Sequence, residues 1–311
     1  MSGFVFSEKY LNKPSEFIKK RIKSLYIPFV TFETIFLLFH NLFVKIGFYG
    51  VFSNVSLMLS YKDFIVNFIK LLTLGYGEQL AGPLWFLISL LEINVIFFLI
   101  LKLSNKISDK YAWIYCGIIV ILLYLVGCYI RLPRMISQSC IGLLFYTFGF
   151  FYKKNESKIK FKFIYFMISL ITLIFCSIFN IIDISRLMIK YKMLLIVSGL
   201  CGTYVVLYLS NKLKFLNNKL ILYCGEKTLY ILALHCLFFK FVMLIEIMIY
   251  NTDRSYLSLF PVYQQNHLWT IIFTVIGTLG PILVKLLIDL LNLKIKNYLK
   301  KLNYKKIKGE I

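Results

Sequence analysis

A cluster of cationic side chains stands near the start of the chain, where Lys19, Lys20, Arg21 and Lys23 precede a long apolar run. Guanidinium and ammonium groups bind phosphate oxygens through charge-assisted hydrogen bonds, so this cluster suits an anionic, phosphate-bearing ligand. A cationic shelf at a membrane surface also anchors a helix electrostatically without binding any other ligand. Residue types alone leave both interpretations open.

A few ionisable side chains lie inside apolar runs, where burial in lipid costs roughly 2.5–3.5 kcal/mol each on insertion scales. Glu33 and His40 are seven residues apart in the first long run and so share a helical face, while Glu92 lies in the second. Lys285 and Asp289 are four residues apart, which allows them to pair on one helix. We expect that pair to be structural.

His235 lies two helical turns into the apolar run that begins at Thr228. Its role is either an interhelical hydrogen bond or the general base that deprotonates a hydroxyl. His40 is the other histidine inside an apolar run. The role of Glu92 is also undecided from spacing: its carboxylate either forms a hydrogen bond within the helix bundle or takes part in catalysis. Among these residues, His235 is our candidate for the catalytic base.

These residues must be positioned by membrane helices. Of the 311 residues, 59% are hydrophobic and 18% aromatic, and the cations collect in short clusters between long apolar runs. We therefore predict an all-α, polytopic transmembrane bundle forming a single domain over residues 1–311. About eight spans are expected, because a bilayer core takes about 20 helical residues. They cover residues 25–44, 84–101, 112–130, 136–152, 163–182, 193–210, 228–250 and 268–293.

The distribution of cations predicts the orientation of the bundle. Lys and Arg are more numerous in alternate connections and in both terminal segments, so we expect both termini in the cytoplasm and the chain in the cytoplasmic membrane. Residues 46–82 then form the longest outer connection, with an interfacial helix or re-entrant element at 63–74. Arg131, Pro133 and Arg134 form a tight outer turn. The net charge of +22 is explained by anionic headgroups rather than nucleic acid.

Familiar soluble-enzyme motifs are missing from the sequence. No P-loop, dinucleotide fingerprint, H-E-x-x-H or G-x-S-x-G occurs. The seven cysteines include no C-x-x-C pair, so we expect neither a disulfide framework nor a zinc site, and no bound cofactor or metal. The N-terminus does not have the pattern of a cleaved signal peptide.

Three patches together resemble the acyltransferase 3 family of multi-pass membrane acyltransferases. They are Ser2–Phe6 followed by Lys20–Pro28, then Gly82–Leu87 with the sequence GPLWFL, then Gly225–His235 with the sequence GEKTLYILALH. Their order and spacing fit across nearly the whole chain. Members typically O-acetylate sugars of cell-surface polysaccharides and use acyl-CoA as the cytoplasmic donor.

The resemblance implies roles for individual residues. Arg21, Lys20 and Lys23 are expected to bind the donor phosphates, and Trp85, Glu92 and Arg134 to bind the acceptor. The family has a second arginine three residues after the first, where this chain has Ser24, so the two lysines must supply that charge. Lysine lacks the guanidinium fork, so this exchange is not neutral.

A second departure concerns the start of the chain. Family members begin with a helix carrying a histidine thought to be catalytic, and a second helix ends in the Ser-Gly-Phe patch. Here Met1 stands directly before that patch, so we expect the first helix and most of the second to be missing. A full-length relative would have about ten spans.

The leading hypothesis is thus a membrane O-acyltransferase that moves an acyl group, most simply acetyl, from acyl-CoA to a surface glycan. We expect this truncated chain to transfer acyl groups poorly or not at all. The alternatives are a transporter or polymerase of polysaccharides or lipid-linked sugars, and an inactive remnant.

Overall fold

The computed structural model describes residues 2–49, 57–108, 110–213, 218–264 and 266–307, with the backbone alone for residues 299–307. Nearly all of the secondary structure in these ranges is helical, as predicted. The chain separates into two compact units. Unit 1 comprises residues 1–31, 70–76 and 84–217, and unit 2 comprises residues 32–69, 77–83 and 218–311. Each unit is described by itself below.

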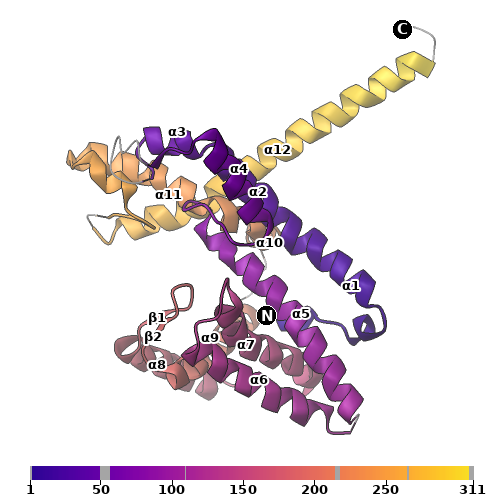
Figure 1. Cartoon of the computed structure of the whole chain (residues 1–311). Coiled ribbons are helices and arrows are strands. Elements are labelled where there is room, and N and C mark those ends of the chain that lie inside the picture. The colour runs from indigo at the N-terminus through magenta and orange to yellow at the C-terminus, as the bar shows by residue number, and fades with distance from the viewer. Residues whose placement is uncertain (1, 50–56, 109, 214–217, 265, 308–311) are drawn as a thin grey trace. The chain divides into compact units, whose positions relative to one another are not determined.

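Unit 1 contains two short 3-10 turns followed by helices that pack alongside one another (Figure 1). In chain order its elements are η1 (Ser2–Val5), η2 (Glu8–Asn12), α1 (Pro14–Arg21), the π-helical turn η3 (Ile22–Tyr26), α5 (Trp85–Ile107), α6 (Ala112–Tyr129), α7 (Ile136–Asn155), η6 (Glu156–Lys158), α8 (Phe163–Phe179), β1 (Ile182–Asp183), β2 (Met188–Ile189) and α9 (Lys192–Lys212). The two strands form an antiparallel hairpin in which Ile182 pairs with Ile189.

Unit 2 is built around a pair of long helices, α11 (Thr228–Tyr250) and α12 (Trp269–Ile307). It also holds α3 (His40–Lys45), α10 (Lys219–Glu226) and η8 (Arg254–Ser258). Three further elements, α2 (Ile27–Leu38), α4 (Tyr61–Leu72) and η5 (Gly82–Leu84), run through the boundaries between the two units in the sequence.

Among the described residues, five helices are long and apolar enough to cross a membrane. They cover Gly82–Ile107, Ala112–Tyr129, Lys192–Lys212, Thr228–Tyr250 and Trp269–Tyr298, and each coincides with a predicted span. The predicted spans at 136–152 and 163–182 are also helical, as α7 and α8. However, α8 has 17 residues, and α7 carries polar residues at its start and two lysines near its end. Eight spans therefore stay a prediction.

The first predicted span, 25–44, is helical but not continuous. It consists of the end of η3, then α2, then α3, with Phe39 between the two helices in a non-helical conformation. The segment that the sequence predicts to lie at the membrane interface is helical as α4. The predicted tight turn at 131–134 is confirmed: Leu132 donates its N–H to the Ser137 hydroxyl, and Arg134 has a φ of 58°.

The core of unit 1 is aromatic. The Phe6 ring lies within 6.4 Å, centroid to centroid, of four other rings, those of Phe17, Phe97, Tyr146 and Phe150. Such edge-to-face contacts add stability beyond the area that they bury. The N-terminal turn can approach α7 this closely because residue 3 is glycine: a Cβ atom there would lie 1.8 Å from the Tyr146 carbonyl oxygen. The Ser-Gly-Phe patch is thus a packing device.

Unit 2 buries two charged side chains of α11. Lys240 is fully buried and donates hydrogen bonds to the carbonyl oxygens of Leu257 and Leu259, which tie the connection after α11 to the helix. Glu246 is also fully buried. On α12, Lys285 pairs with Asp289, as the four-residue spacing predicts.

Candidate acyl-transfer site

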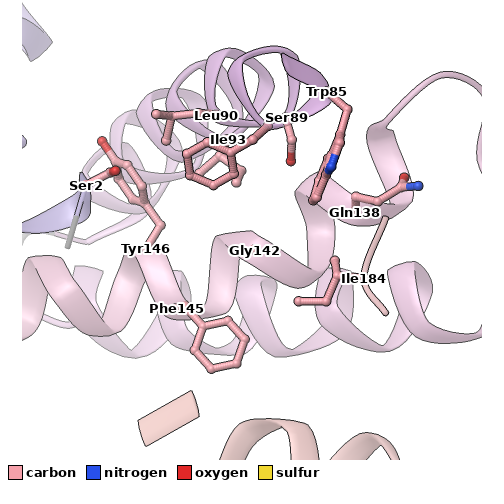
Figure 2. A pocket seen from close by; sticks show the side chains of 11 residues that line it. Ser2, Trp85, Ser89, Leu90, Ile93, Gln138, Gly142, Phe145, Tyr146 and Ile184 are labelled. Atoms are coloured by element: carbon pink, nitrogen blue, oxygen red, sulfur yellow. The ribbon is translucent and has the colours of Figure 1, made fainter. Parts of the chain in front are cut away.

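A cavity of about 220 Å³ lies within unit 1 between α5 and α7 (Figure 2). Most of its walls are apolar. They are formed by Ser2, Trp85, Phe86, Ser89, Leu90, Ile93, Gln138, Gly142, Phe145, Tyr146 and Ile184. Small-molecule sites are typically concave and apolar, with a few placed polar groups, and this cavity has that composition.

Trp85 enters the cavity because of the turn that precedes it. Gly82 and Pro83 begin the short 3-10 helix η5, and the buried Leu84 fixes the start of α5. The indole therefore stands at the first position of α5, and Figure 2 shows it beside Gln138 and Ile184. An indole face is a suitable platform for the C–H face of a ring-shaped ligand.

The hairpin between α8 and α9 closes one side of the cavity. Gln138 donates from Nε2 to the Ser185 carbonyl oxygen at 3.0 Å, and Ile184 of the same turn lines the wall. Asp183 holds this turn by accepting hydrogen bonds from the Ser185 hydroxyl and the Arg186 N–H, and these bonds lower the pKa of its carboxyl. The cavity wall thus depends on a hydrogen-bonded turn outside the helices.

Glu92 is partly buried on α5 and accepts a hydrogen bond of 2.6 Å from the Ser139 hydroxyl on α7. Ser139 in turn lies 3.0 Å from the hydroxyl oxygen of Ser89, which lines the cavity. Arg134 is exposed, but its charge acts on Glu92. Two of the expected acceptor residues, Glu92 and Arg134, thus interact electrostatically, and Trp85 lies about two turns before Glu92 on the same helix.

The cationic cluster divides into different environments. Lys19 and Lys23 are exposed, and Lys20 donates a hydrogen bond to the Tyr10 hydroxyl, which lowers the pKa of Tyr10. Arg21 is partly buried, with its guanidinium 5.2 Å from the centre of the Phe17 ring. Within the described part of the chain, its Nε is buried without a hydrogen-bond partner.

The charge of Arg21 also acts on Tyr146. Tyr146 lines the cavity and donates its hydroxyl hydrogen bond to Asn94, so this residue links the cationic cluster to the cavity within unit 1. Arg21 is therefore a cation of the cluster whose charge acts on a cavity-lining side chain. Lys20 is held by Tyr10 instead.

His235 lies in unit 2, on α11. Its Nδ1 is 2.8 Å from the Ile231 carbonyl oxygen one turn earlier, and its ring packs edge-on against Phe239. This carbonyl can only accept, so Nδ1 carries a proton. Both contacts lie within α11, so the interhelical hydrogen bond expected from the sequence stays a prediction. A catalytic role for His235 stays a prediction.

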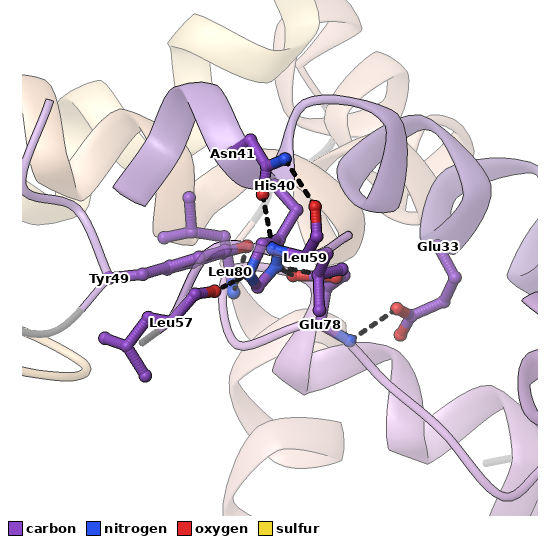
Figure 3. Close-up of polar contacts among 8 residues, drawn as sticks. All are labelled: Glu33, His40, Asn41, Tyr49, Leu57, Leu59, Glu78 and Leu80. Atoms are coloured by element: carbon purple, nitrogen blue, oxygen red, sulfur yellow. Dashed lines mark hydrogen bonds and ion pairs between the residues drawn. The ribbon is translucent and has the colours of Figure 1, made fainter. Parts of the chain in front are cut away.

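His40 is held by a second carboxylate that sequence reasoning did not single out (Figure 3). Its Nδ1 lies 3.0 and 3.1 Å from the two carboxylate oxygens of Glu78, and its Nε2 lies 2.9 Å from the Leu57 carbonyl oxygen. Glu33 accepts the backbone N–H of Glu78 at 2.7 Å. Because both ring nitrogens face oxygens, the His40–Glu78 pair must hold an extra proton, on the imidazole or on the carboxyl.

Sequence reasoning missed the residues that join α5 to α7 at the cavity: Ser89, Gln138 and Ser139. A signal for two of them exists, because Ser137, Gln138 and Ser139 form a polar triplet at the start of an otherwise apolar run. Three consecutive polar residues in a membrane helix suggest a lining or a bonded interface. Among the described residues, no group of three or more His, Cys, Asp or Glu side chains is placed to hold a metal ion.

Five long apolar helices among the described residues indicate an integral membrane protein, and unit 1 encloses an apolar cavity. The family model for the acyltransferase domain of the acyltransferase 3 family matches residues 1–286, and the chain belongs to this family. The match confirms the resemblance seen in the three motifs and lends no support to the transporter or polymerase alternative. No curated protein and no solved structure matches the chain.

Proposed function

We propose that this protein transfers an acyl group, most simply acetyl, from cytoplasmic acyl-CoA to a hydroxyl of a cell-surface polysaccharide or its precursor. The observation that carries the proposal is the cavity between α5 and α7. Its wall includes Tyr146, on which Arg21 acts, together with Trp85 and Ser89, the latter bonded to Ser139 beside Glu92. Family membership supplies the reaction class.

In this proposal, different residues bind the acyl donor and the acceptor. Arg21 binds donor phosphate through charge-assisted hydrogen bonds, with Lys20 and Lys23 adding to the local positive potential. The acyl thioester then lies in the apolar cavity, which excludes water and so disfavours hydrolysis. Trp85 stacks on the acceptor ring, while Glu92 and Arg134 supply the charged groups at the acceptor side. The protein is placed in the cytoplasmic membrane with both termini in the cytoplasm.

The direct test is acyl transfer by the purified chain in lipid vesicles. Radiolabelled acetyl-CoA is supplied with a panel of methyl hexopyranosides, and ester-linked label in the sugar is measured by chromatography before and after mild base. We expect base-labile label that forms slowly and that depends on both Trp85 and Arg21. No label in any pyranoside, in vesicles that contain correctly folded protein, would contradict the proposal.

The orientation is tested separately. Single cysteines at positions 158 and 254, introduced into a chain whose seven native cysteines are replaced, are reacted with a membrane-impermeant maleimide. We expect Lys158→Cys to react from the cytoplasmic side and Arg254→Cys from the outer side. Reaction of both from the same side shows the topology to be wrong.

A further inference from the structure

The hydroxyls of Ser89 and Ser139 form a chain between the cavity and the Glu92 carboxylate. Ser139 Oγ lies 2.6 Å from Glu92 Oε2 and 3.0 Å from Ser89 Oγ. Ser89 and Ser139 are almost completely buried, at 3% and 0% exposed. Figure 2 shows the Ser89 side chain extending from α5 on the side that faces α7. Glu92 itself is not among the cavity-lining residues.

The direction of these bonds follows from counting protons. A hydroxyl has one proton to donate, and Ser139 has four oxygens within reach: Glu92 Oε2, Ser89 Oγ, the Met135 carbonyl at 2.8 Å and the Ser89 carbonyl at 3.3 Å. The 2.6 Å contact has the length of a hydroxyl bonded to a carboxylate, which is the strongest of the four. Ser139 therefore donates to Glu92, and Ser89 donates to Ser139.

This arrangement leaves the Ser89 oxygen with lone pairs available on the cavity side. A hydroxyl of a molecule in the cavity can donate to Ser89, so one continuous chain of donors runs from the cavity to a carboxylate. If Glu92 is protonated, each hydroxyl rotates and the chain runs the other way, toward the cavity. The same three groups can thus remove a proton and later return one.

We propose that Ser89, Ser139 and Glu92 form a proton relay that activates the acceptor hydroxyl, with Glu92 as the terminal base. This inference rests on the proposed acyl transfer. The acceptor O–H proton passes to Ser89 as the Ser89 proton passes to Ser139 and the Ser139 proton to Glu92. The acceptor oxygen forms its bond to the acyl carbon, the carbon–sulfur bond breaks, and the leaving thiolate of CoA takes up the proton that Glu92 returns through Ser139 and Ser89.

Ser89 touches the acceptor and is a catalytic residue in this scheme, whereas Ser139 and Glu92 act through it. Glu92→Gln removes the terminal base, and Ser139→Ala removes the hydroxyl between Ser89 and Glu92. Each is expected to lower kcat about 100-fold or more, the usual contribution of a positioned base, with little change in KM. Ser139→Thr keeps a hydroxyl at the same place and should recover most of the rate.

The matched control is Ser104→Ala. Ser104 is a fully buried serine on the same helix, and its hydroxyl has no hydrogen-bond partner within the described part of the chain. We expect full activity from this variant. A solvent isotope effect separates a relay from a structural role: the parent chain should slow in D₂O, and the residual rate of Ser139→Ala should lose that sensitivity. Full kcat in Ser139→Ala, with acyl transfer intact in the parent chain, would overturn the relay.

A second measurement needs no turnover, so it distinguishes failure of the relay from failure of the proposed function. Infrared spectra of the chain in lipid vesicles contain carboxyl bands, and the Glu92 band is the one lost in Glu92→Gln. Ser139→Ala should shift this band because it removes the direct bond, and Ser89→Ala should shift it less because it removes the donor to Ser139. Ser104→Ala should leave it in place. If Ser89→Ala leaves the Glu92 band unshifted, Ser89 is not hydrogen-bonded to Glu92 through Ser139, and the relay is contradicted.

Discussion

Two cavities of nearly equal volume, about 220 Å³ in unit 1 and about 230 Å³ in unit 2, differ in the state of their polar groups. In unit 2, His40 bonds Glu78 and the Leu57 carbonyl, and Asn41 bonds both backbone groups of Leu59. In unit 1, the hydroxyl chain ends at Ser89 on the cavity wall. Cavity volume alone therefore does not identify a ligand site. The more informative property is whether a polar group on the cavity wall can still form a hydrogen bond with a ligand.

From this difference we predict a structural role for the polar cluster around His40. Its hydrogen bonds close the segment at residues 57–60 onto α3, and Tyr49 adds a weak bond to the Leu80 N–H at 3.4 Å (Figure 3). A buried, hydrogen-bonded charge pair costs more to break than to keep. Unit 2 should thus respond to mutation mainly in stability, and the cavity of unit 1 mainly in reaction rate.

The largest expected effect is on stability, from His40→Ala. It leaves the Glu78 carboxylate buried without its imidazole partner, which typically costs about 3–5 kcal/mol. We expect a correspondingly lower midpoint of unfolding in detergent micelles, measured by near-UV circular dichroism. His267→Ala, which removes an exposed histidine from the same unit, is the matched control. Equal unfolding midpoints for the two variants would show that the His40 cluster does not stabilise unit 2, and would contradict the structural role predicted for it.

Arg21→Ala tests the donor side of the unit 1 cavity. Loss of hydrogen bonds to a charged group costs about 1.5–3 kcal/mol, so the Kd for acetyl-CoA should rise about 10- to 100-fold. The remaining binding should also depend less on salt, because one cation is lost. Isothermal titration calorimetry at two salt concentrations measures both quantities. Lys19→Ala, at an exposed cation of the same cluster, should change affinity much less; equal losses would return the cluster to a general anchoring role.

Trp85→Ala tests the acceptor side. Aromatic stacking contributes about 0.5–1.5 kcal/mol beyond buried area, so the KM for a pyranoside acceptor should rise up to about tenfold. Donor affinity should stay unchanged, and Trp85→Phe should recover part of the loss. Steady-state kinetics with each substrate varied in turn separates the two. A change confined to donor KM would place the indole at the wrong end of the cavity.

The smallest expected effect concerns the hairpin at the cavity wall. Hydrogen bonds from Ser185 and Arg186 lower the pKa of Asp183. Their contribution is present above the unfolded pKa, near 3.8, and is lost as pH falls through the lower folded value. At neutral pH, Asp183→Ala should therefore speed amide exchange of Arg186 about fivefold, as a loss of about 1 kcal/mol predicts. Mass spectrometry after deuterium labelling measures this rate, and an unchanged rate would show that the side chain does not hold the turn.

Much of the helical layout could be predicted because lipid makes the apolar run itself the signal. Helix α11 was predicted at 228–250 and occupies those residues, and the predicted span 112–130 differs from α6 by one residue. The interruption at Phe39 was not predicted, because the span was placed on its overall hydrophobicity, although the polar residues His40 and Asn41 directly follow Phe39. In the structure, His40 and Asn41 hydrogen-bond to the backbone of Leu57 and Leu59.

The candidate site was only partly predictable for a similar reason. Trp85, Glu92 and Arg21 stand in motifs or carry charges that are unusual at their depth, so the sequence marks them individually. Ser89 and Ser139 do not stand out, because serine is tolerated throughout membrane helices and their contact joins positions fifty residues apart. Their function depends on which helices become neighbours, and this information is tertiary.

The close contact of Gly3 with the backbone of Tyr146 has a consequence for synthesis in the cell. Ser2 and Tyr146 both line the cavity, so its wall is incomplete until α7 has left the ribosome. At roughly 5–20 residues per second, the N-terminal turn waits on the order of ten seconds for the helix on which it packs. During that interval Phe6 has only Phe17 and later Phe97 as ring partners, and Phe4 still lacks the Tyr152 ring.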